Sequence, residues 1–365
     1  MATTRIPPPA RLEPRQTTAR GPAAYWDRPR PGAAVTPSRP AFPAPGTADP
    51  GDGATVAIDI GGTKIAGALV GPDGTMAAAT RRPTPHGAAG DGDAVFAAVA
   101  EVVAELARSP LWPSAVRCGI GSAGPVDSSR GTVSPVNIGA WRDFPVRARV
   151  EAELARHGAP LPAVLVGDGV AMTAAEHWLG AARGRANALC MVVSTGVGGG
   201  LVLDNRLHPG PTGNAGHIGH ISVAFDGERC ACGGRGCVES LASGTAIARW
   251  ALARGWVPGG DATAAGVAAA AAAGDPLALA AFDRAGRALA AAIAACATLA
   301  ETDLAVIGGG VAAAGDVLFG PVRAHLADYA ALSFTGGLEV VPAALGTDAG
   351  LIGAAAAAMM LPPAA

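Results

Sequence analysis

Two glycine-rich turns constrain the fold of this chain more than any other feature. The first lies in 59–64 (DIGGTK), where the alternating segment ATVAIDIGG (54–62) meets a second apolar segment. The second lies in 194–200 (STGVGGG), inside a similar stretch at 187–207. Alternating apolar segments that flank a short glycine turn are typical of paired β-strands. Because strands and helices separate the two copies, the repeated pattern predicts a duplicated α/β unit.

The other segments follow strand or helix periodicity. A Pro-Asp-Gly turn at 72–74 and a third strand extend the first unit. The sequence AVRCGIGSAGPVD predicts a buried strand that breaks into a glycine loop at 119–125. Further strands are predicted at 162–168 and 303–311. Helical spacing is found at 91–109, 147–157, 169–182, 243–255, 261–273, 276–300 and 349–360.

Composition limits the classes of function open to the chain. Half of its 365 residues are hydrophobic, which is enough for a large core, and the net charge of −2 argues against a nucleic-acid partner. The N-terminus has no apolar signal region, and the longest apolar run (288–300) is too short to span a bilayer. Six cysteines without an export signal indicate a reducing compartment. We therefore expect a cytoplasmic protein with no membrane partner.

Residues 1–53 differ in composition from the rest of the chain. The first 50 residues hold 12 of the 30 prolines and very few Val, Ile or Leu residues. Such a segment cannot bury enough apolar surface to offset the entropy of ordering. We expect it to be a disordered tail.

The first glycine turn is a candidate phosphate site. Gly61 and Gly62 let backbone N–H groups approach phosphate oxygens, and Thr63 adds a hydroxyl. Asp59 is placed to hold the water shell of Mg²⁺, and Lys64, the only lysine of the chain, would put a cation near phosphate. An ordinary hairpin turn explains the same residues, and the spacing is not that of a Walker A loop.

Two further glycine segments strengthen this interpretation. Thr195, Gly196 and Gly198 belong to the corresponding turn of the second unit. Gly308, Gly309 and Gly310 end a strand, which suits a base or ribose close to the backbone. Three glycine segments at strand ends favour a bound nucleotide over three unrelated turns.

The most specific pattern is a histidine followed by three closely spaced cysteines. One imidazole and three thiolates complete a tetrahedral set with no position left for water, which is typical of structural zinc. Disulfides are a poor alternative because two of the cysteines are too close for a relaxed bridge. The proposed zinc ligands are His220, Cys230, Cys232 and Cys237. The other cysteines, Cys118, Cys190 and Cys296, lie in apolar segments and are predicted to be buried.

Asp168 follows a predicted strand and precedes a predicted helix. A carboxylate at this junction points into a cleft, where it can accept a hydroxyl proton. On spacing alone, the alternative that Asp168 caps the helix at 169–182 is favoured.

Together these motifs resemble the ROK family of bacterial sugar kinases. DIGGTK, GIGSAGPVD, STGVGGGLVLD, GNAGHIGHI, CACGGRGCVESLASG and IGGGV occur in the family's order and cover essentially all of residues 54–361. The resemblance implies an actin-like (ribonuclease H-like), two-lobed α/β ATPase fold with a cleft between the lobes. It places the N-terminal lobe at 54–167 and the C-terminal lobe at 168–361, with the helix at 349–360 packing back on the first lobe. Family repressors carry an N-terminal winged helix, and residues 1–53 lack the apolar periodicity for one, which favours an enzyme.

The resemblance also assigns roles to individual residues. It implies that Asp168 is the catalytic base and that ATP, Mg²⁺ and structural Zn²⁺ are the cofactors. The implied phosphate and adenosine contacts are Asp59, Gly61, Gly62, Thr63, Lys64, Thr195, Gly196, Gly198, Gly308, Gly309 and Gly310. The implied sugar contacts are Asn137, Asp168, His217, His220 and Glu239, with His220 shared between zinc and sugar. Family members often form dimers or tetramers, so a homo-oligomer is expected.

Two departures from the family pattern bear on the substrate. Gly167 stands where relatives usually have Asn, which removes a hydroxyl contact. The segment 215–220 reads AGHIGH, so His217 replaces the glutamate of glucokinase-like members, as in bacterial N-acetylmannosamine kinases. The expected activity is ATP-dependent phosphorylation of the 6-hydroxyl of a hexose or N-acetylhexosamine, with N-acetylmannosamine favoured. Glucokinase is the first alternative, and a sugar-binding regulator without catalysis is the second.

Overall fold

The computed structural model describes residues 53–85, 92–135 and 137–362. The predicted tail at 1–53 therefore lies outside the described residues except for Gly53. All described residues belong to one compact unit.

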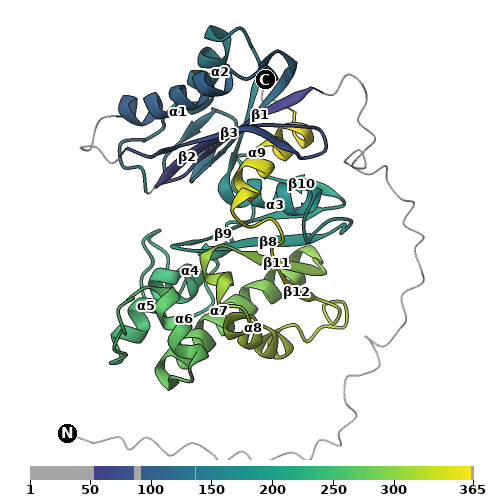
Figure 1. The fold of residues 1–365 in the computed structure, drawn as a ribbon. Coiled ribbons are helices and arrows are strands. Elements are labelled where there is room, and N and C mark those ends of the chain that lie inside the picture. Colours follow the sequence, from purple (N-terminus) through teal and green to yellow (C-terminus); the bar gives the residue numbers. More distant parts are fainter. Residues whose placement is uncertain (1–52, 86–91, 136, 363–365) are drawn as a thin grey trace, which may run out of the picture. The chain divides into compact units, whose positions relative to one another are not determined.

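Two five-stranded sheets form the framework (Figure 1). The first has the order β3-β2-β1-β4-β7, and its strands are Met76–Pro83, Lys64–Val70, Ala54–Ile60, Ala115–Ser122 and Ala163–Gly167. The second has the order β10-β9-β8-β11-β12, and its strands are Arg206–His208, Val197–Leu203, Ala188–Val193, Leu304–Gly308 and Glu339–Pro342. In both sheets the first three strands are antiparallel and the next two pairings are parallel. The prediction of a duplicated α/β unit is confirmed.

Helices cover the two sheets and also lie between them (Figure 1). The helices α1 (Gly92–Leu106) and α2 (Val146–Arg156) pack with the first sheet. Five helices of the described chain share a hydrophobic cluster with the second sheet. Between β10 and β11 the chain forms α4 (Val238–Ala242), α5 (Gly244–Leu252), α6 (Ala264–Ala272) and α7 (Pro276–Ala300), and between β11 and β12 it forms α8 (Asp316–Tyr329). Two helices pack on each other between the sheets: α3 (Asp168–Trp178) contacts β8 and β9, and α9 (Ala349–Met360) contacts β1 and β4.

Three hydrophobic clusters form the core. One belongs to the first sheet and its helices, and one to the second sheet and α4–α8. The third joins both sheets through α3 and α9, with buried residues such as Ala57, Val166, Cys190 and Ala355. Cys118, Cys190 and Cys296 are all buried, as predicted. Because burial of apolar surface is the main stabilising contribution, the third cluster ties the halves of the molecule together.

The glycines at 119 and 121 were assigned wrongly to a loop. Strand β4 runs through them to Ser122, so the turn begins only at Ala123. A Cβ atom on Gly119 would lie 1.9 Å from the carbonyl oxygen of Ala354 in α9. Glycine is present there because a helix backbone approaches the strand closely, not because the chain turns.

The strand predicted at 303–311 is also shorter than expected. It ends at Gly308, and Gly310–Ala314 form a short 3₁₀ helix. Other short elements are the hairpin β5 (Val126–Asp127) and β6 (Thr132–Val133), and the 3₁₀ helices Trp112–Ser114, Ile218–His220 and Gly346–Asp348.

Among the described residues, no single helix has the length and apolar character needed to cross a membrane. The pair α6 and α7 meets these two criteria only when taken together, and it is bent by 115°.

Candidate active site

Asp168 lies at the junction of β7 and α3, beside the second glycine turn. It is the first residue of α3, and Gly167 occupies the N-cap position, so the alternative that Asp168 caps the helix is wrong. Its Oδ1 accepts a hydrogen bond of 2.7 Å from the adjacent Gly169 N–H. A Cβ atom on Gly198 would lie 3.8 Å from the same oxygen. The helix start therefore presents a carboxylate directly to the second turn.

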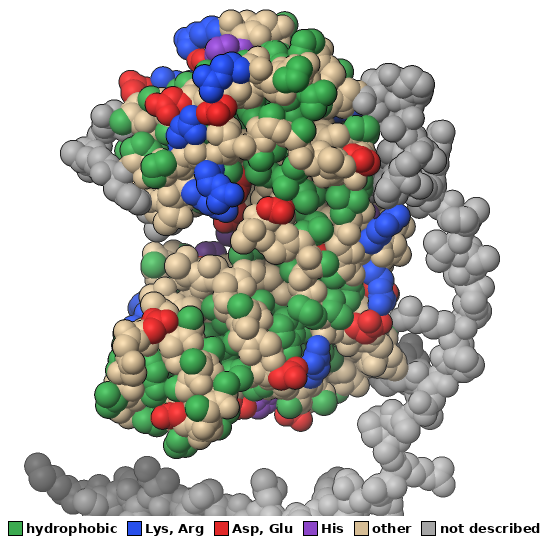
Figure 2. All heavy atoms as spheres, in the orientation of Figure 1, with side chains coloured by type: hydrophobic (Ala, Val, Ile, Leu, Met, Phe, Trp, Pro, Cys, Tyr) green, Lys and Arg blue, Asp and Glu red, His purple; other side chains and the backbone are tan. Residues whose placement is uncertain are grey.

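The environment of Asp168 raises the pKa of its carboxyl group. The residue is accessible to solvent, yet protein surrounds the carboxylate on most sides. Loss of hydration raises the pKa of Asp168, while the Gly169 N–H and nearby His217 lower it by a smaller amount. Figure 2 shows the surface hollowed between the two halves of the described chain, with acidic and histidine side chains visible inside the hollow.

Asp59 faces the same region from the first sheet. It is near the end of β1, in the sheet pairing opposite Ala66, and the following turn is closed by a 2.9 Å hydrogen bond from the Gly61 N–H to the Lys64 carbonyl. Desolvation raises the pKa of Asp59 to about 6; Lys64 lowers it and Asp168 raises it. The structure thus brings Asp59, Lys64 and Asp168 close enough to interact electrostatically.

Replacing Asp59 by asparagine should stabilise the free protein at pH 8. The pKa of Asp59 is raised from 3.8 to about 6 on folding, so ionisation opposes folding above about pH 6 and this cost vanishes below about pH 4. After allowance for solvent screening, we expect a gain of about 1–2 kcal/mol at pH 8 that shrinks as the pH falls toward 4. Urea unfolding of both proteins at several pH values measures it, and a gain independent of pH would contradict the assignment.

Asn137 lies against the first turn. A Cβ atom on Gly62 would be 2.4 Å from the Asn137 amide nitrogen. Its loop is fixed by Arg142, whose guanidinium donates to the carbonyls of Pro135, Ile138 and Trp141 at 3.0, 3.4 and 2.6 Å. Arg142 was not predicted, because an arginine that binds backbone carbonyls leaves no spacing signal in the sequence.

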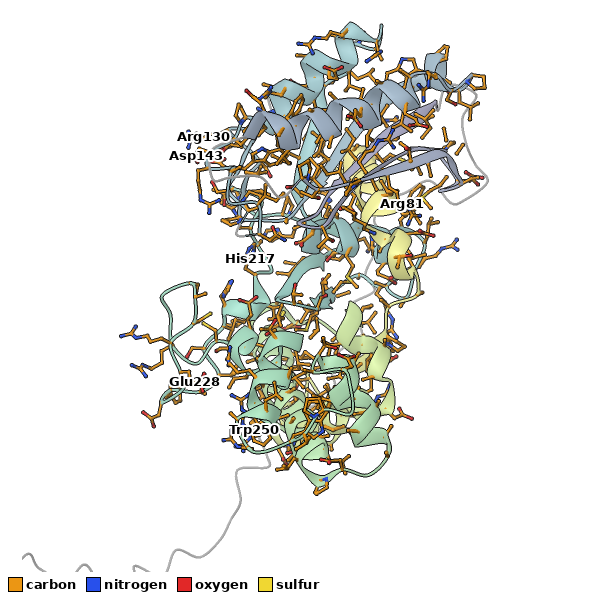
Figure 3. The ribbon with its side chains drawn as sticks, turned by 60° about the vertical axis from the view of Figure 1, so that its left-hand side comes forward. Arg81, Arg130, Asp143, His217, Glu228 and Trp250 are labelled. Carbon is orange, nitrogen blue, oxygen red and sulfur yellow. The ribbon has the colours of Figure 1, made fainter. Side chains whose placement is uncertain are left out.

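His217 lies between the two halves of the described chain (Figure 3). Its Nδ1 is 3.1 Å from the carbonyl oxygen of Asn214, which can only accept, so Nδ1 carries the proton. In the neutral ring, Nε2 is then a hydrogen-bond acceptor, and a Cβ atom on Gly124 would lie 3.9 Å from it. His217 is accordingly placed to accept from a hydroxyl group.

Asn214 is a residue that the sequence analysis missed. Its side-chain amide donates to the Val126 carbonyl at 2.7 Å and accepts from the Val126 N–H at 3.3 Å, as a neighbouring strand would. A backbone hydrogen bond of 3.0 Å from Ser128 to Thr212 supports the same contact. These bonds join the loop that carries His217 to the β5–β6 hairpin.

Hydrogen bonds with α4 and α5 hold the second turn in place. The Val197 N–H donates to Glu239 Oε2 at 2.9 Å, so the carboxylate of Glu239, which was predicted as a sugar contact, binds the turn. The Gly244 N–H donates to the Ser194 carbonyl at 2.7 Å, and the Thr245 hydroxyl donates to the Thr195 carbonyl at 3.1 Å. The turn is therefore preorganised rather than free to move.

A cavity of about 320 Å³ lies beside the third glycine segment. Gly309 has φ +88°, a backbone angle that glycine accepts readily, and Gly310 begins the 3₁₀ helix that forms one wall. Helix α6 forms the other wall. The glycines were predicted from the sequence, but the contribution of α6 was not. A run of alanines does not distinguish a helix face that lines a cavity from one that does not.

The four predicted zinc ligands come together. Their ligand atoms all lie within 4.8 Å of one another. Cys232 Sγ and Cys237 Sγ are 3.7 Å apart, and Cys230 Sγ is 3.9 Å from His220 Nδ1. A tetrahedral zinc with Zn–S bonds of about 2.3 Å requires sulfur atoms about 3.8 Å apart, so the donor set fits. Because Nδ1 faces the thiolates, Nε2 of His220 is directed away from them.

Glu176 is a second missed residue. It is fully buried in α3, and its carboxylate accepts from the N–H groups of Ala181, Ala344 and Leu345 at 2.7, 3.0 and 3.0 Å. It thereby fixes the segment that leads into α9. At the start of α9, a Cβ atom on Gly350 would lie 2.5 Å from Asp59 Oδ2. A lone glutamate in the apolar helix was the only signal in the sequence.

Comparison with known proteins identifies similar chains over almost the whole described region. The model of the ROK family matches residues 55–360. The glucokinase of Streptomyces coelicolor is 34% identical over 83% of this chain and 96% of its own length. The N-acetylmannosamine kinase of Escherichia coli O139:H28 is 37% identical over 82% of this chain and 97% of its own. The crystal structure of a ROK family glucokinase from Streptomyces griseus in complex with glucose and AMPPNP superposes with a TM-score of 0.70, at 33% identity over 84% of this chain and 99% of that chain.

Proposed function

The chain belongs to the ROK family, and from this premise we propose that it is an ATP-dependent kinase that phosphorylates a sugar hydroxyl. Membership also accounts for the two similar sheets, which form the predicted actin-like, two-lobed fold. The observation that carries the proposal is the meeting of two carboxylates with the glycine turns: Asp168 at the second turn and Asp59 at the first. Phosphoryl transfer needs mainly alignment and charge neutralisation, which such an arrangement supplies.

In this proposal Asp168 accepts the proton of the attacking hydroxyl. Burial raises the pKa of Asp168, which makes the ionised carboxylate a stronger base than that of an ordinary aspartate. The N–H groups of Gly62, Gly196 and Gly198 would bind the phosphates, with Thr63, Thr195 and Lys64 beside them. The Gly61 N–H already donates to the Lys64 carbonyl, so Gly61 would serve the close approach of the turn and not donate to a phosphate. Bound Mg²⁺, with Asp59 nearby, would neutralise charge on the transferring phosphate. Gly308–Gly310 border the base.

The sugar would bind between Asn137, His217, His220 and Glu239. Asn137 reaches the site from the first half of the chain, and the other three come from the second half. Because Nδ1 of neutral His217 is bound to the Asn214 carbonyl, Nε2 offers one acceptor without a negative charge. That suits a sugar whose N-acetyl oxygen would be repelled by a carboxylate, and it favours N-acetylmannosamine over glucose.

We propose a structural zinc ion in the His220–Cys237 cluster. His220, Cys230, Cys232 and Cys237 would hold it in a closed tetrahedral site. The His220 nitrogen that faces away from the cysteines is then available to a sugar hydroxyl. Zinc would fix the orientation of the ring that contacts the substrate.

A sugar-binding regulator without catalysis is the second candidate. Gly167, adjacent to Asp168, supports it, because it replaces the asparagine that would bind a hydroxyl. A Cβ atom on Gly167 would meet only the Gly213 carbonyl oxygen, at 3.9 Å, so the backbone itself leaves room for the missing side chain. Binding of sugar without consumption of ATP would support this candidate.

A coupled assay of ADP release over a panel of sugars tests the proposal. We expect turnover with at least one hexose or N-acetylhexosamine, and highest kcat/KM with N-acetylmannosamine. Glucose as the best substrate would retain the kinase assignment and change its specificity. No turnover with any sugar of the panel would contradict the kinase assignment.

Replacing His217 by glutamate should shift specificity toward glucose. The carboxylate gains a second acceptor for hydroxyls but repels an N-acetyl oxygen, so we expect the ratio of kcat/KM values to move toward glucose by about tenfold. The same sugar panel measures this ratio. The N-acetylmannosamine kinase of Escherichia coli and the glucokinase of Streptomyces coelicolor serve as references for the two specificities. An unchanged ratio would show that His217 does not determine specificity.

A further inference from the structure

The cavity beside Gly310 has an unusual lining. Its wall on α6 consists of alanines on one helix face, at positions 264, 265, 268, 269 and 272. Most of these side chains are exposed or half-buried, where a surface helix ordinarily carries polar residues. The opposite wall comes from Gly310–Ala314, and Phe282 completes the lining. Every one of the ten lining residues is Ala, Gly, Val or Phe, so none has a polar side chain.

The cavity adjoins the second glycine turn. A Cβ atom on Gly310 would lie 3.8 Å from the Ser194 hydroxyl, and one on Gly244 would lie 3.4 Å from Ala264 Cβ. The Gly244 N–H in turn binds the Ser194 carbonyl at 2.7 Å. If phosphates bind at the second turn, as the proposed function has it, the adjoining cavity is within reach of the base of the same nucleotide.

The polar side chains next to the cavity serve as N-caps of helices. The Thr263 hydroxyl accepts from the Ala265 N–H at 3.3 Å and caps α6. The Ser243 hydroxyl accepts from the Ala246 N–H at 3.2 Å and caps α5. Neither residue lines the cavity. A base in the cavity thus meets apolar side chains on both of its faces and no side chain that reads its edge.

We propose that the phosphoryl donor of this enzyme is a purine nucleoside triphosphate in general, not ATP alone. Adenine and guanine differ in the hydrogen-bonding groups at their edges and have nearly equal ring areas. A site that hydrogen-bonds one group rejects the analogue lacking it by about 10⁴–10⁵, whereas an apolar pocket discriminates by about 10² or less. No side chain that lines this cavity can hydrogen-bond a base, so the cavity belongs to the second kind and would hold the flat ring mainly by burial.

Binding of the non-hydrolysable analogues AMPPNP and GMPPNP, measured by calorimetry with Mg²⁺ on the full chain, tests this inference apart from turnover. We expect the two Kd values to agree within about tenfold, and kcat/KM for ATP, GTP and ITP to agree equally well. A preference for AMPPNP above about a hundredfold, or binding of neither analogue, would overturn it. If both analogues bind with similar Kd values but no sugar is phosphorylated, the shared purine site stands and the kinase assignment fails.

A substitution that fills the cavity tests its location. Ala265→Leu places an apolar side chain on the cavity face at an exposed position of α6, and leucine is a good helix former, so folding should be retained. We expect the Kd values of AMPPNP and GMPPNP to rise by the same factor, about tenfold, while the Kd of the sugar stays unchanged. Ala269→Leu, on the same face, repeats the test, and Ala273→Leu, exposed and outside the lining, is the matched control. Unchanged nucleotide binding in both cavity variants, or weakening of only one analogue, would overturn the inference.

Discussion

Asp168→Asn should reduce kcat by about 10² to 10⁴, the range found for a positioned general base. Asparagine keeps the size of the side chain and can still accept from the Gly169 N–H, so the start of α3 should be preserved. It cannot take a proton from the attacking hydroxyl. Because the change acts on proton transfer, sugar and nucleotide Kd values should change by less than about tenfold.

Steady-state kinetics together with calorimetry measure both parts of this prediction. Asp204→Asn is a suitable control, since Asp204 lies in the β9–β10 turn with φ +51°, which asparagine also adopts readily. A kcat within threefold of the unaltered protein would remove Asp168 from the mechanism. A large loss of sugar affinity with kcat retained would make it a binding residue only.

Cys237→Ser should abolish zinc binding and weaken the sugar Kd by at least about tenfold. Cys237 is buried and is the residue before α4. Two positions later, Glu239 accepts from the Val197 N–H in the second turn. Without the metal, the segment before α4 would no longer be fixed. His220, Glu239 and the second turn would then lose their defined positions.

Zinc content by mass spectrometry and sugar binding by calorimetry measure this effect. The Cys296→Ala variant is the control, because Cys296 is buried in α7, outside the ligand cluster, and should leave one zinc per chain. Nucleotide binding in the cavity beside Gly310 should be affected less than sugar binding. Full sugar affinity in a zinc-free Cys237→Ser protein would contradict a supporting role for the metal.

Much of the framework follows from local patterns. The junction of β7 and α3 at Asp168 was predicted because an apolar strand meets a helical periodicity there. The cluster of His220 and three cysteines was predicted because the cysteines are close in sequence, so a metal-binding pattern is visible in the spacing alone. The role proposed for Asp168, in contrast, required the family resemblance, since spacing by itself favoured a helix cap.

The errors and omissions involve contacts between distant segments. Gly119 was assigned to a loop because the helix that requires it, at Ala354, lies near the other end of the chain. Asn214 and Glu176 were missed because each binds backbone groups far away in sequence, Val126 in one case and Ala344 in the other. Backbone N–H and C=O groups are the same in nearly every residue, so a sequence pattern cannot show which of them a side chain will bind.

The division of the chain into lobes at 167/168 and a homo-oligomeric state remain predictions. In the described structure, α3 and α9 share a hydrophobic cluster with strands of both sheets. The boundary between the lobes therefore depends on the lobe to which these two helices are assigned. If the halves close on substrate, Asn214 and the β5–β6 hairpin would have to move together, because their hydrogen bonds join the halves.

The proposed reaction is transfer of a phosphoryl group from a nucleotide held at the two glycine turns to a sugar hydroxyl deprotonated by Asp168. Phosphorus NMR of the reaction of the full chain with ATP, Mg²⁺ and N-acetylmannosamine or glucose tests it most directly. We expect a new phosphomonoester signal coupled to the protons at C6 of one of these sugars, formed in equal amount with ADP. Unchanged ATP, or hydrolysis to free phosphate without any sugar phosphate, would contradict it.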